Sequence, residues 1–374
     1  MTNRYRNAYA EIDLEAIHHN LTVIKENLQS GNEVIPVLKA NAYGHGSVEI
    51  AKYIVEKGVN ILAVTLLEEA MELRENGVTS PIIVLGWVSP AYAHIAAENN
   101  LVLTVFQKNW LKRVNELGLL KTNLSIHVKF DTGMGRNGIR SNEELSGFTN
   151  EALKSNNIEI TGVFTHFATS DNEDATYFNE QINRFEGLFS CLTTFVEESQ
   201  LMVHIGNSAA SLQHPKQMTH YSRVGVSMYG MYPSADVKKA VDVKLKPALT
   251  LRSELIHVKK VKLGDKISYG GTYEVSADEW IGTVAFGYGD GWVRKLQGSY
   301  VLVEGKRMQI VGRICMDMFM IKLDKEYEVT TPVTMIGADH DAFISVDEVA
   351  EYIDTINYEV TTLLTNRVPR VYIR

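Results

Sequence analysis

Apolar and polar positions follow two different periods along this chain, and the period changes near residue 245. After Asp13, apolar side chains recur every three or four residues at Leu14, Ile17, Leu21 and Ile24. This spacing predicts an amphipathic helix whose first turn is capped by Asp13. Similar spacing predicts further helices over residues 66–76, 91–98, 108–117, 142–155 and 175–198.

Short apolar runs separate these helices. They predict strands at residues 34–38, 61–65, 81–85, 101–105, 124–130, 158–165, 202–205 and 223–228. Strands that are apolar on both faces and alternate with helices are typical of parallel sheets. Eight such units favour a closed barrel, which usually needs roughly 250 residues, over an open doubly wound sheet. Periodicity alone leaves the open sheet as an alternative.

After Lys244 the chain changes to strict alternation of apolar and polar residues, as in half-buried antiparallel strands. We expect strands within 249–273 and at 280–286, 300–303, 308–314, 319–323 and 333–336, with one helix at 346–355. The predicted fold is therefore α/β: a TIM (β/α)8 barrel at residues 12–244, followed by a mostly β C-terminal domain at residues 245–374.

Reactive side chains cluster where the predicted strands end, which is where barrel enzymes place their chemistry. Lys39 and Tyr43 follow the first strand in the stretch VIPVLKANAYGHG. The later strand ends carry Lys129, Asp131, Arg136, His166, His204, Asn207 and Ser208, and the eighth strand holds Arg223, Gly225 and Val226.

A lysine at the end of an early strand can hold an aldehyde cofactor as a Schiff base. A phosphate in a barrel tends to sit at the loops after strands seven and eight, near a helix N-terminus. Ser208 opens a predicted helix there, and Gly225 and Val226 can donate backbone N–H groups. Together these residues predict pyridoxal 5'-phosphate, although a solvent-facing lysine and a simple helix-capping serine are the alternatives.

Other motifs point less clearly to chemistry. Gly133, Gly135 and Gly138 fit the dinucleotide pattern GxGxxG, but they follow the fifth strand, whereas that fingerprint belongs to the first βα turn. The histidines lack the HExxH spacing, and we expect no metal site. Ser208 lacks the GxSxG elbow of a serine nucleophile.

Composition limits the partners and the compartment. The 374 residues have a formal net charge of −8 and no basic run, which argues against a nucleic-acid partner. Cys191 and Cys315 are the two cysteines, so we expect no disulfide framework and a reducing compartment. With no apolar run near the ~20 residues of a membrane helix and no signal-like N-terminus, we expect a cytoplasmic protein that does not interact with membranes.

The motifs in combination resemble those of alanine racemases, over nearly the whole chain. They stand in the order VLKANAYGHG, DTGMGRNGIR, THFATSD, HIGNSAAS, RVGVSMYGMYP, ISYGGTY, GYGDGW, GRICMDM and NYEV…RVPRVY. The resemblance implies a barrel plus a β domain that also includes the 1–11 segment. It also implies an isomerase that interconverts L-alanine and D-alanine for peptidoglycan synthesis, and a homodimer with shared active sites.

The resemblance also implies roles for individual residues. Lys39 binds the cofactor and acts as one base, and Tyr269 of the partner subunit is the opposite base. The implied cofactor contacts are Tyr43, Arg136, His166, Ser208, Arg223, Gly225, Val226 and Tyr358. Arg136, together with Met316 and Tyr288 of the partner subunit, is expected to shape the substrate pocket. Lys129 matches a position that is carbamylated in many members.

Bases on opposite faces of the substrate allow inversion without rotation of the substrate. A free tyrosine has a pKa of roughly 10, so Tyr269 needs a nearby cation such as Arg223 or His166 to act as a base. A basic amino-acid decarboxylase shares this architecture, but it places a carboxylate where Arg223 stands. A non-catalytic pyridoxal-phosphate carrier has no use for a β domain, and broad-specificity racemases tend to be exported.

Overall fold

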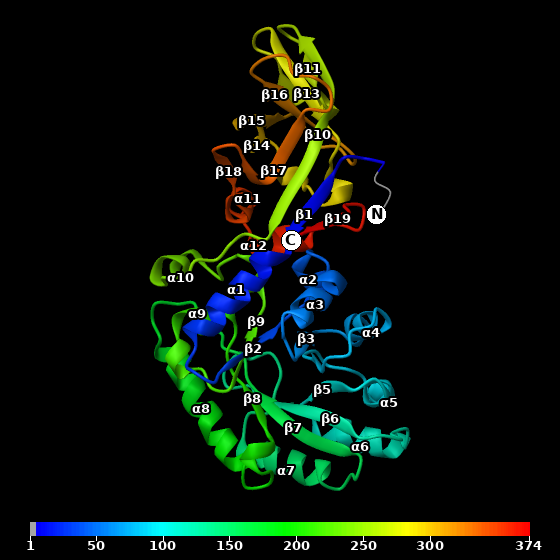
Figure 1. Ribbon diagram of the computed structural model, residues 1–374, viewed down its shortest axis with the longest axis vertical. Helices are drawn as coiled ribbons and strands as arrows, with labels where there is room; N and C mark the ends of the chain where they lie inside the picture. The colour runs from blue at the N-terminus through cyan, green and yellow to red at the C-terminus, as the bar shows by residue number, and fades with distance from the viewer. Residues whose placement is uncertain (1–4) are drawn as a thin grey trace. The chain divides into compact units, whose positions relative to one another are not determined.

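The computed structural model describes residues 5–374. The described chain separates into two compact units (Figure 1). The barrel unit contains residues 17–42 and 47–246, and the β unit contains the segment that ends at Ala16, Tyr43–Gly46 and Pro247–Arg374. The domain boundaries at 12–244 and 245–374 stay predictions, and residues 1–4 of the 1–11 segment lie outside the described residues.

The barrel unit is built on parallel strands. Those between residues 17 and 246 are β2 (Glu33–Pro36), β3 (Leu62–Val64), β4 (Ile82–Val84), β5 (Leu101–Val105), β6 (Leu124–Lys129), β7 (Ile158–Phe164), β8 (Met202–His204) and β9 (Tyr221–Val224). Strands β3 to β8 pair in order, and β2 pairs with β9. Parallel bridges from Val37 to Ala63 and from Gly206 to Ser222 join these sheets. The strands therefore close into a ring, which confirms the predicted barrel.

Helices follow most of these strands along the chain and surround the barrel (Figure 1). They are α1 (Leu14–Asn27), α3 (Ser47–Glu56), α4 (Leu67–Glu75), α5 (Ala93–Glu98), α6 (Lys108–Leu117), α7 (Asn142–Ala152), α8 (Thr176–Leu192), α9 (Ser208–Gln213) and α10 (Ala235–Ala240). Asp13 caps α1 as predicted, because its Oδ1 accepts from the Ala16 N–H at 2.8 Å.

Several predicted boundaries were wrong; α7, for example, ends at Ala152 and not at residue 155, and two other boundaries differ more. Helix α8 ends at Leu192 and not at residue 198. Leu192 is followed by the β-branched and aromatic run TTFV, which has a low helix propensity. Strand β9 ends at Val224, so Gly225 and Val226 do not lie in the eighth strand. Gly225 has φ −103° and ψ −101°, which breaks the strand, and a 3₁₀ turn at Val226–Tyr229 follows. The apolar pattern RVGVSMYGM does not distinguish these conformations.

The β unit contains a long, mostly antiparallel sheet, in which β1 and β19 form a parallel pair. Within the described residues the strand order is β18-β17-β14-β15-β16-β13-β10-β1-β19, and β10 also pairs with β17. The bounds are β1 (Tyr9–Asp13), β10 (Leu249–Val261), β13 (Glu279–Val284), β14 (Tyr300–Val303), β15 (Lys306–Val311), β16 (Phe319–Leu323), β17 (Pro332–Asp339), β18 (Ala342–Ile344) and β19 (Arg370–Ile373). This confirms the mostly β C-terminal part. Helices α11 (Val346–Ile353) and α12 (Asn357–Thr362) precede the last strand, so the expectation of a single helix here was wrong.

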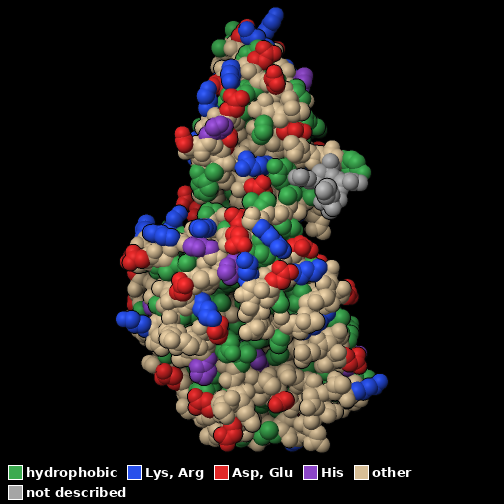
Figure 2. Space-filling view, viewed as in Figure 1, with side chains coloured by type: hydrophobic (Ala, Val, Ile, Leu, Met, Phe, Trp, Pro, Cys, Tyr) green, Lys and Arg blue, Asp and Glu red, His purple; other side chains and the backbone are tan. Residues whose placement is uncertain are grey.

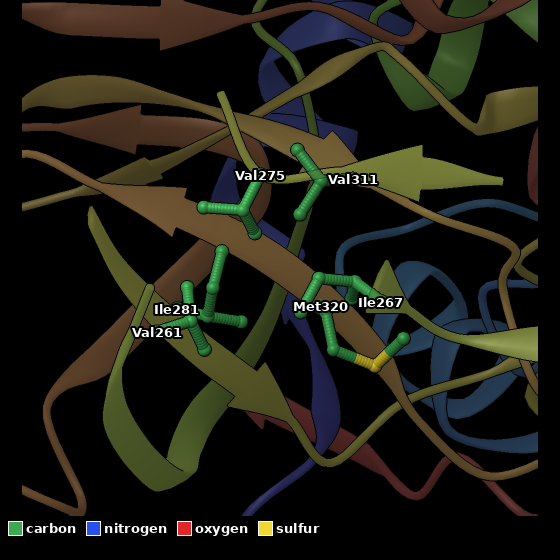
Figure 3. Close-up of a cluster of buried hydrophobic side chains, with 6 residues drawn as sticks. All are labelled: Val261, Ile267, Val275, Ile281, Val311 and Met320. Atoms are coloured by element: carbon green, nitrogen blue, oxygen red, sulfur yellow. The ribbon is translucent and has the colours of Figure 1, made fainter. Parts of the chain in front are cut away.

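A buried apolar cluster supports one end of this sheet (Figure 3). It consists of Val261, Ile267, Val275, Ile281, Val311 and Met320. Ile267 belongs to the short strand β11 (Lys266–Ile267), which pairs with β12 (Tyr273–Glu274). Tyr273 and Cys315 pack against the cluster. The cluster therefore anchors the hairpin whose tip carries Tyr269.

Asp290 is a fully buried carboxylate that ties the start of the β unit to its end. It accepts from Arg6 at 2.7 and 2.9 Å and from the Gly287 N–H at 3.0 Å. The Arg367 guanidinium lies 3.4 Å away. Removing a buried ionic partner leaves the other groups uncompensated.

We expect Asp290→Ala to lower the free energy of unfolding by about 2 kcal/mol, because the two arginines retain partial access to solvent. Thermal unfolding measures the loss. Asp317→Ala is the matched control, because Asp317 also binds Arg367, at 2.6 Å, but is 53% exposed. Equal losses in the two variants would contradict a special role for the buried carboxylate.

On the surface, acidic and basic side chains are intermixed over the face shown in Figure 2. Among residues 5–374, no helix is both long and apolar enough to span a membrane.

Candidate active site

The backbone after Lys39 makes a left-handed turn. Ala40, Asn41, Ala42 and Tyr43 have φ values of 52–53°, and Gly44 follows at 84°. Left-handed backbone costs an L-residue roughly 1–2 kcal/mol, so this turn persists only where neighbouring groups hold it. One such contact is the Asn41 Oδ1, which accepts from the Ser47 N–H at 2.9 Å. The turn directs the chain from the end of the first barrel strand to α3.

The Lys39 amine lies in a positively charged and partly buried environment. Burial is the largest cause that lowers its pKa, and the positive charges of Arg136 and Arg223 lower it further. Glu69 acts in the opposite direction. The lowered pKa increases the neutral fraction of the amine, which is the nucleophilic and basic form.

Lys129 and Arg136 belong to β6 and the glycine-rich loop after it. The Lys129 Nζ donates to the Asn137 Oδ1. Asp131 shapes the loop, because its Oδ1 accepts from the Gly133 N–H at 3.2 Å and the Gly135 N–H at 2.8 Å. Burial, followed by the charges of Arg136 and Arg223, lowers the pKa of Lys129 to about 8. The glycine pattern thus forms a loop around a carboxylate.

Arg223 is 4% exposed and lies at the centre of the buried polar groups. It donates to the Thr165 carbonyl oxygen at 2.7 Å and to the His204 Nδ1 at 3.0 Å, and its Nη2 lies 3.4 Å from the His166 Nδ1. Burial and the charge of Arg136 lower the pKa of Arg223 to about 9, so it stays a cation at neutral pH. The pKa of His166 falls well below its usual value through burial and Arg223, so His166 is neutral there.

The contacts of Arg223 also fix the protons on a pair of buried histidines. A guanidinium only donates, so the His204 Nδ1 is an acceptor and its proton lies on Nε2. That nitrogen lies 2.8 Å from the His127 Nδ1, which must accept in turn. Burial lowers the pKa of His127 to about 3, and that of His204 falls well below its usual value for the same reason. Arg223 is therefore supported by neutral imidazoles.

This pair makes stability dependent on pH. A histidine in the unfolded chain has a pKa near 6.5. Below that pH the unfolded chain therefore binds a proton at His127, whereas the folded protein does not. The contribution of neutral His127 to the free energy of unfolding is therefore complete above pH ~6.5 and decreases as the pH falls toward 3. At pH 5, His127 alone lowers the free energy of unfolding by about 2 kcal/mol relative to pH 7. We expect the thermal midpoint of His127→Gln to fall less between pH 7 and pH 5 than that of the parent. An identical fall in both proteins would contradict this assignment.

Ser208 contacts the segment after β9. Its Oγ accepts from the Gly225 N–H at 3.0 Å. Ser208 is not the helix cap, because the cap of α9 is Asn207, whose Oδ1 accepts from the Ala210 N–H at 2.9 Å. The structure therefore brings Ser208, Gly225 and Val226 together at the predicted place.

Two predicted tyrosines meet within the β unit. The rings of Tyr43 and Tyr358 have centroids 6.0 Å apart. Their backbones are closely packed, because a Cβ on Gly44 would lie 2.0 Å from the Thr361 carbonyl oxygen. Glycine is needed at this position both for that approach and for its φ of +84°.

The remaining predicted residues form an exposed group on the β unit. Tyr269 is 70% exposed, Met316 52% and Tyr288 41%. Their loops are joined: the Ser268 Oγ donates to the Arg313 carbonyl oxygen at 2.5 Å, and the Tyr288 N–H donates to the Cys315 carbonyl oxygen at 3.0 Å. The sites predicted from sequence thus form one set in the barrel unit and another in the β unit.

A cavity of about 990 Å³ lies at the end of the barrel where the strands begin. It is lined by residues near the start of the strands, among them Val34, Ser125, His127 and Met202. Lys39, Arg136 and His166 follow the carboxyl ends of their strands, which is the catalytic face of such barrels. We therefore place the candidate site at the carboxyl ends and not in this cavity.

Comparisons with known proteins agree over the whole chain. The family profile for the alanine racemase N-terminal domain matches residues 12–233, and that for the C-terminal domain matches residues 248–372. The chain belongs to the alanine racemase family. It is 45% identical to the alanine racemase of Anoxybacillus flavithermus over 372 residues, which are 99% of this chain and 96% of the relative.

Solved structures of the family show the same fold. A crystal structure of the Bacillus anthracis alanine racemase with bound L-Ala-P has a TM-score of 0.95 and 46% identity, and the match covers 100% of this chain and 96% of that one. A histidine racemase from Leuconostoc mesenteroides reaches a TM-score of 0.92 at 30% identity, covering 100% and 99%. Membership makes the chain an amino-acid racemase, as the motifs predicted.

Sequence reasoning missed residues that support this site. His127 lies two positions before Lys129 in a strand, a spacing that places both side chains on one face. Glu69 stands three positions after Leu66, which is the spacing of a capping box, and its carboxylate accepts from the Leu66 N–H at 2.9 Å. Each signal was present in the sequence, but neither distinguishes a supporting residue from an ordinary one.

Proposed function

We propose that this enzyme interconverts L-alanine and D-alanine with pyridoxal 5'-phosphate, and that Lys39 and Tyr269 of the partner subunit are its two bases. The observation that carries the proposal is the Lys39 amine, whose pKa is lowered beside Arg136 and Arg223 at the carboxyl end of a barrel strand. Family membership supports alanine as the substrate.

The donor groups of this chain fit an aromatic aldehyde that carries a phosphate. Lys39 provides the amine for the aldehyde. Ser208, Gly225 and Val226 would provide a hydroxyl and backbone N–H groups for the phosphate, and the family resemblance adds the phenol groups of Tyr43 and Tyr358. Arg223 would face the ring nitrogen, with His166 beside it. When bound, pyridoxal phosphate supplies a conjugated system that accommodates the negative charge left at the substrate Cα.

The residues of the chain transfer the Cα proton of the substrate and bind its carboxylate. The neutral Lys39 amine takes or returns the Cα proton on one face, and the Tyr269 phenolate of the partner subunit does so on the other. Because His166 is neutral, Arg223 is the cation that we assign to stabilise the phenolate. Arg136 binds the substrate carboxylate, and Met316 and Tyr288 of the partner subunit limit the size of the pocket.

Arg223 also suits racemisation rather than transamination. A guanidinium facing the ring nitrogen would keep its proton at neutral pH, so the bound ring would be a weaker electron sink than with a carboxylate partner. We expect Arg223→Glu to raise the ratio of transamination to racemisation, measured as pyruvate formed per alanine inverted. An unchanged ratio in folded, cofactor-loaded protein would contradict this account.

We assign Lys129 as a site of carbamylation. Its pKa of about 8 leaves a reactive neutral fraction at physiological pH. The amine nitrogen bonds to the carbon of CO₂ and releases a proton, and the resulting carbamate can accept hydrogen bonds from Arg136. A carbon-13 signal after incubation with labelled bicarbonate, absent in Lys129→Ala, tests this assignment.

We infer a homodimer in the cytoplasm that supplies D-alanine for peptidoglycan. The exposed group of Tyr269, Tyr288 and Met316 is suited to reach the barrel of a second copy. Sedimentation that shows a monomer at full activity would contradict shared sites.

The proposed function is tested by following the circular dichroism of L-alanine, L-serine, L-lysine and L-histidine with the cofactor-loaded protein. We expect the signal to decay for alanine. L-Histidine is included because a histidine racemase shares the fold. Release of carbon dioxide from lysine in place of racemisation would indicate the decarboxylase alternative.

A further inference from the structure

The left-handed turn after Lys39 requires restraints in addition to the contact between Asn41 and Ser47. Its residues, Ala40 to Tyr43, include no glycine, although each has a positive φ. Left-handed backbone is unfavourable for L-residues, so the turn is less stable than ordinary backbone unless other groups bind it. The position of the Lys39 amine depends on this turn, because the turn begins at the next residue.

Glu69, in the first turn of α4, binds this backbone directly. Its Oε1 accepts from the Ala40 N–H at 2.6 Å. Its Oε2 accepts from the Thr65 N–H at 2.8 Å and the Leu66 N–H at 2.9 Å. A single carboxylate thus joins the loop after β3 to the residue that follows Lys39, through charge-assisted hydrogen bonds of the stronger kind.

Helix capping explains only half of this arrangement. The contacts of Oε2 with Thr65 and Leu66 are those of a glutamate that closes the start of its own helix. The contact of Oε1 with Ala40 binds the turn after β2, which is not part of α4. A glutamine keeps one carbonyl oxygen, so it can serve one of these backbones but not both, and its NH₂ group would face an N–H donor.

We propose that Glu69 is a positioning residue, which holds the left-handed turn and thereby sets the position of the Lys39 amine. The inference rests on the proposed function in one respect, namely that Lys39 is the reactive amine. Glu69 also opposes the influence of Arg136 and Arg223, because its charge raises the pKa of Lys39 while theirs lower it.

Three variants distinguish the hydrogen bond between Glu69 and Ala40 from the effect of the negative charge of Glu69. Glu69→Gln removes the charge and one set of hydrogen bonds. Glu69→Asp keeps the charge but shortens the reach to Ala40. Glu68→Gln is the matched control, because Glu68 is an exposed neighbour on the same helix. Amide hydrogen exchange of the peptide 39–46 in the cofactor-loaded protein reports on the turn independently of catalysis.

We expect exchange in this peptide to be about tenfold faster in both Glu69 variants, which corresponds to the loss of one charged hydrogen bond. We expect kcat to fall at least about tenfold in Glu69→Gln, with KM for alanine within about twofold, because the amine is misplaced while the substrate contacts remain. When pyridoxal phosphate is removed and rebound, the pH midpoint of rebinding shifts downward in Glu69→Gln but not in Glu69→Asp, because only the former loses the charge that raises the pKa of Lys39.

Exchange in Glu69→Gln equal to that in Glu68→Gln would overturn the proposal. Faster exchange with unchanged kcat and unchanged rebinding would also overturn it, because Glu69 would then be structural only. If instead Lys39→Ala racemises alanine normally, the proposed function fails, whereas the exchange result still decides whether Glu69 holds the turn.

Discussion

Lys39→Ala is expected to lower kcat for alanine racemisation at least about 10³-fold, within the range for removal of a general acid or base. The variant loses both the covalent bond to the cofactor and the base on one face of the substrate. The measurements are circular dichroism of alanine and visible absorbance of the protein with added pyridoxal phosphate. Lys52→Ala is the control, because Lys52 lies in α3 with its side chain 42% exposed, at 3.9 Å from Glu49.

A Lys39→Ala protein that keeps the absorbance of bound cofactor after dialysis, and racemises at the parent rate, would exclude Lys39 as the site of attachment. Addition of methylamine provides a further check. If the missing group is an amine, this small amine restores part of the proton transfer in Lys39→Ala and has no effect on the control.

Tyr269→Phe is expected to lower racemisation about 10²–10⁴-fold in both directions, because the overall equilibrium constant cannot depend on the enzyme. The difference between the two bases appears in isotope exchange. In deuterated water, one alanine enantiomer should still exchange its Cα proton through Lys39, whereas the other should not. Proton nuclear magnetic resonance follows the loss of the Cα signal.

Tyr273→Phe is the control for this experiment. Tyr273 lies in the same motif and donates its hydroxyl to the Glu279 Oε1 at 2.7 Å, so its loss affects the hairpin without removing a base. Exchange of both alanine enantiomers in Tyr269→Phe would mean that another group serves the face assigned to Tyr269.

The hydrophobic pattern predicts the order of elements well and local backbone geometry poorly. The barrel strands and the cap at Asp13 follow from apolar spacing and one carboxylate. The left-handed turn at Ala40–Tyr43 does not, because alanine and asparagine adopt a positive φ here only through contacts made elsewhere in the fold. The break at Gly225 was missed because residues on both sides of it are apolar.

The candidate site shows the same limit at the level of side chains. The strand ends identify Lys39, Arg136 and His166, because the carboxyl ends of the barrel strands carry the chemistry. They give no indication that His166 is neutral, which depends on burial beside Arg223. The role of Glu69 depends on a hydrogen bond from the backbone N–H of Ala40, 29 positions earlier in the chain. The local hydrophobic pattern contains no information about a contact at that distance.

Strand β1 is enclosed by segments from the far end of the chain. Ala10 pairs with Leu251 of β10 on one side and with Arg370 of β19 on the other (Figure 1). During translation at ~5–20 residues per second, β1 therefore waits roughly 20–70 seconds before its last neighbour is made. In that interval its N–H and C=O groups lack their final partners, and unpaired strand edges favour aggregation. The first strand is therefore completed later than any strand of the barrel, whose last pairing, between β2 and β9, ends at Val224.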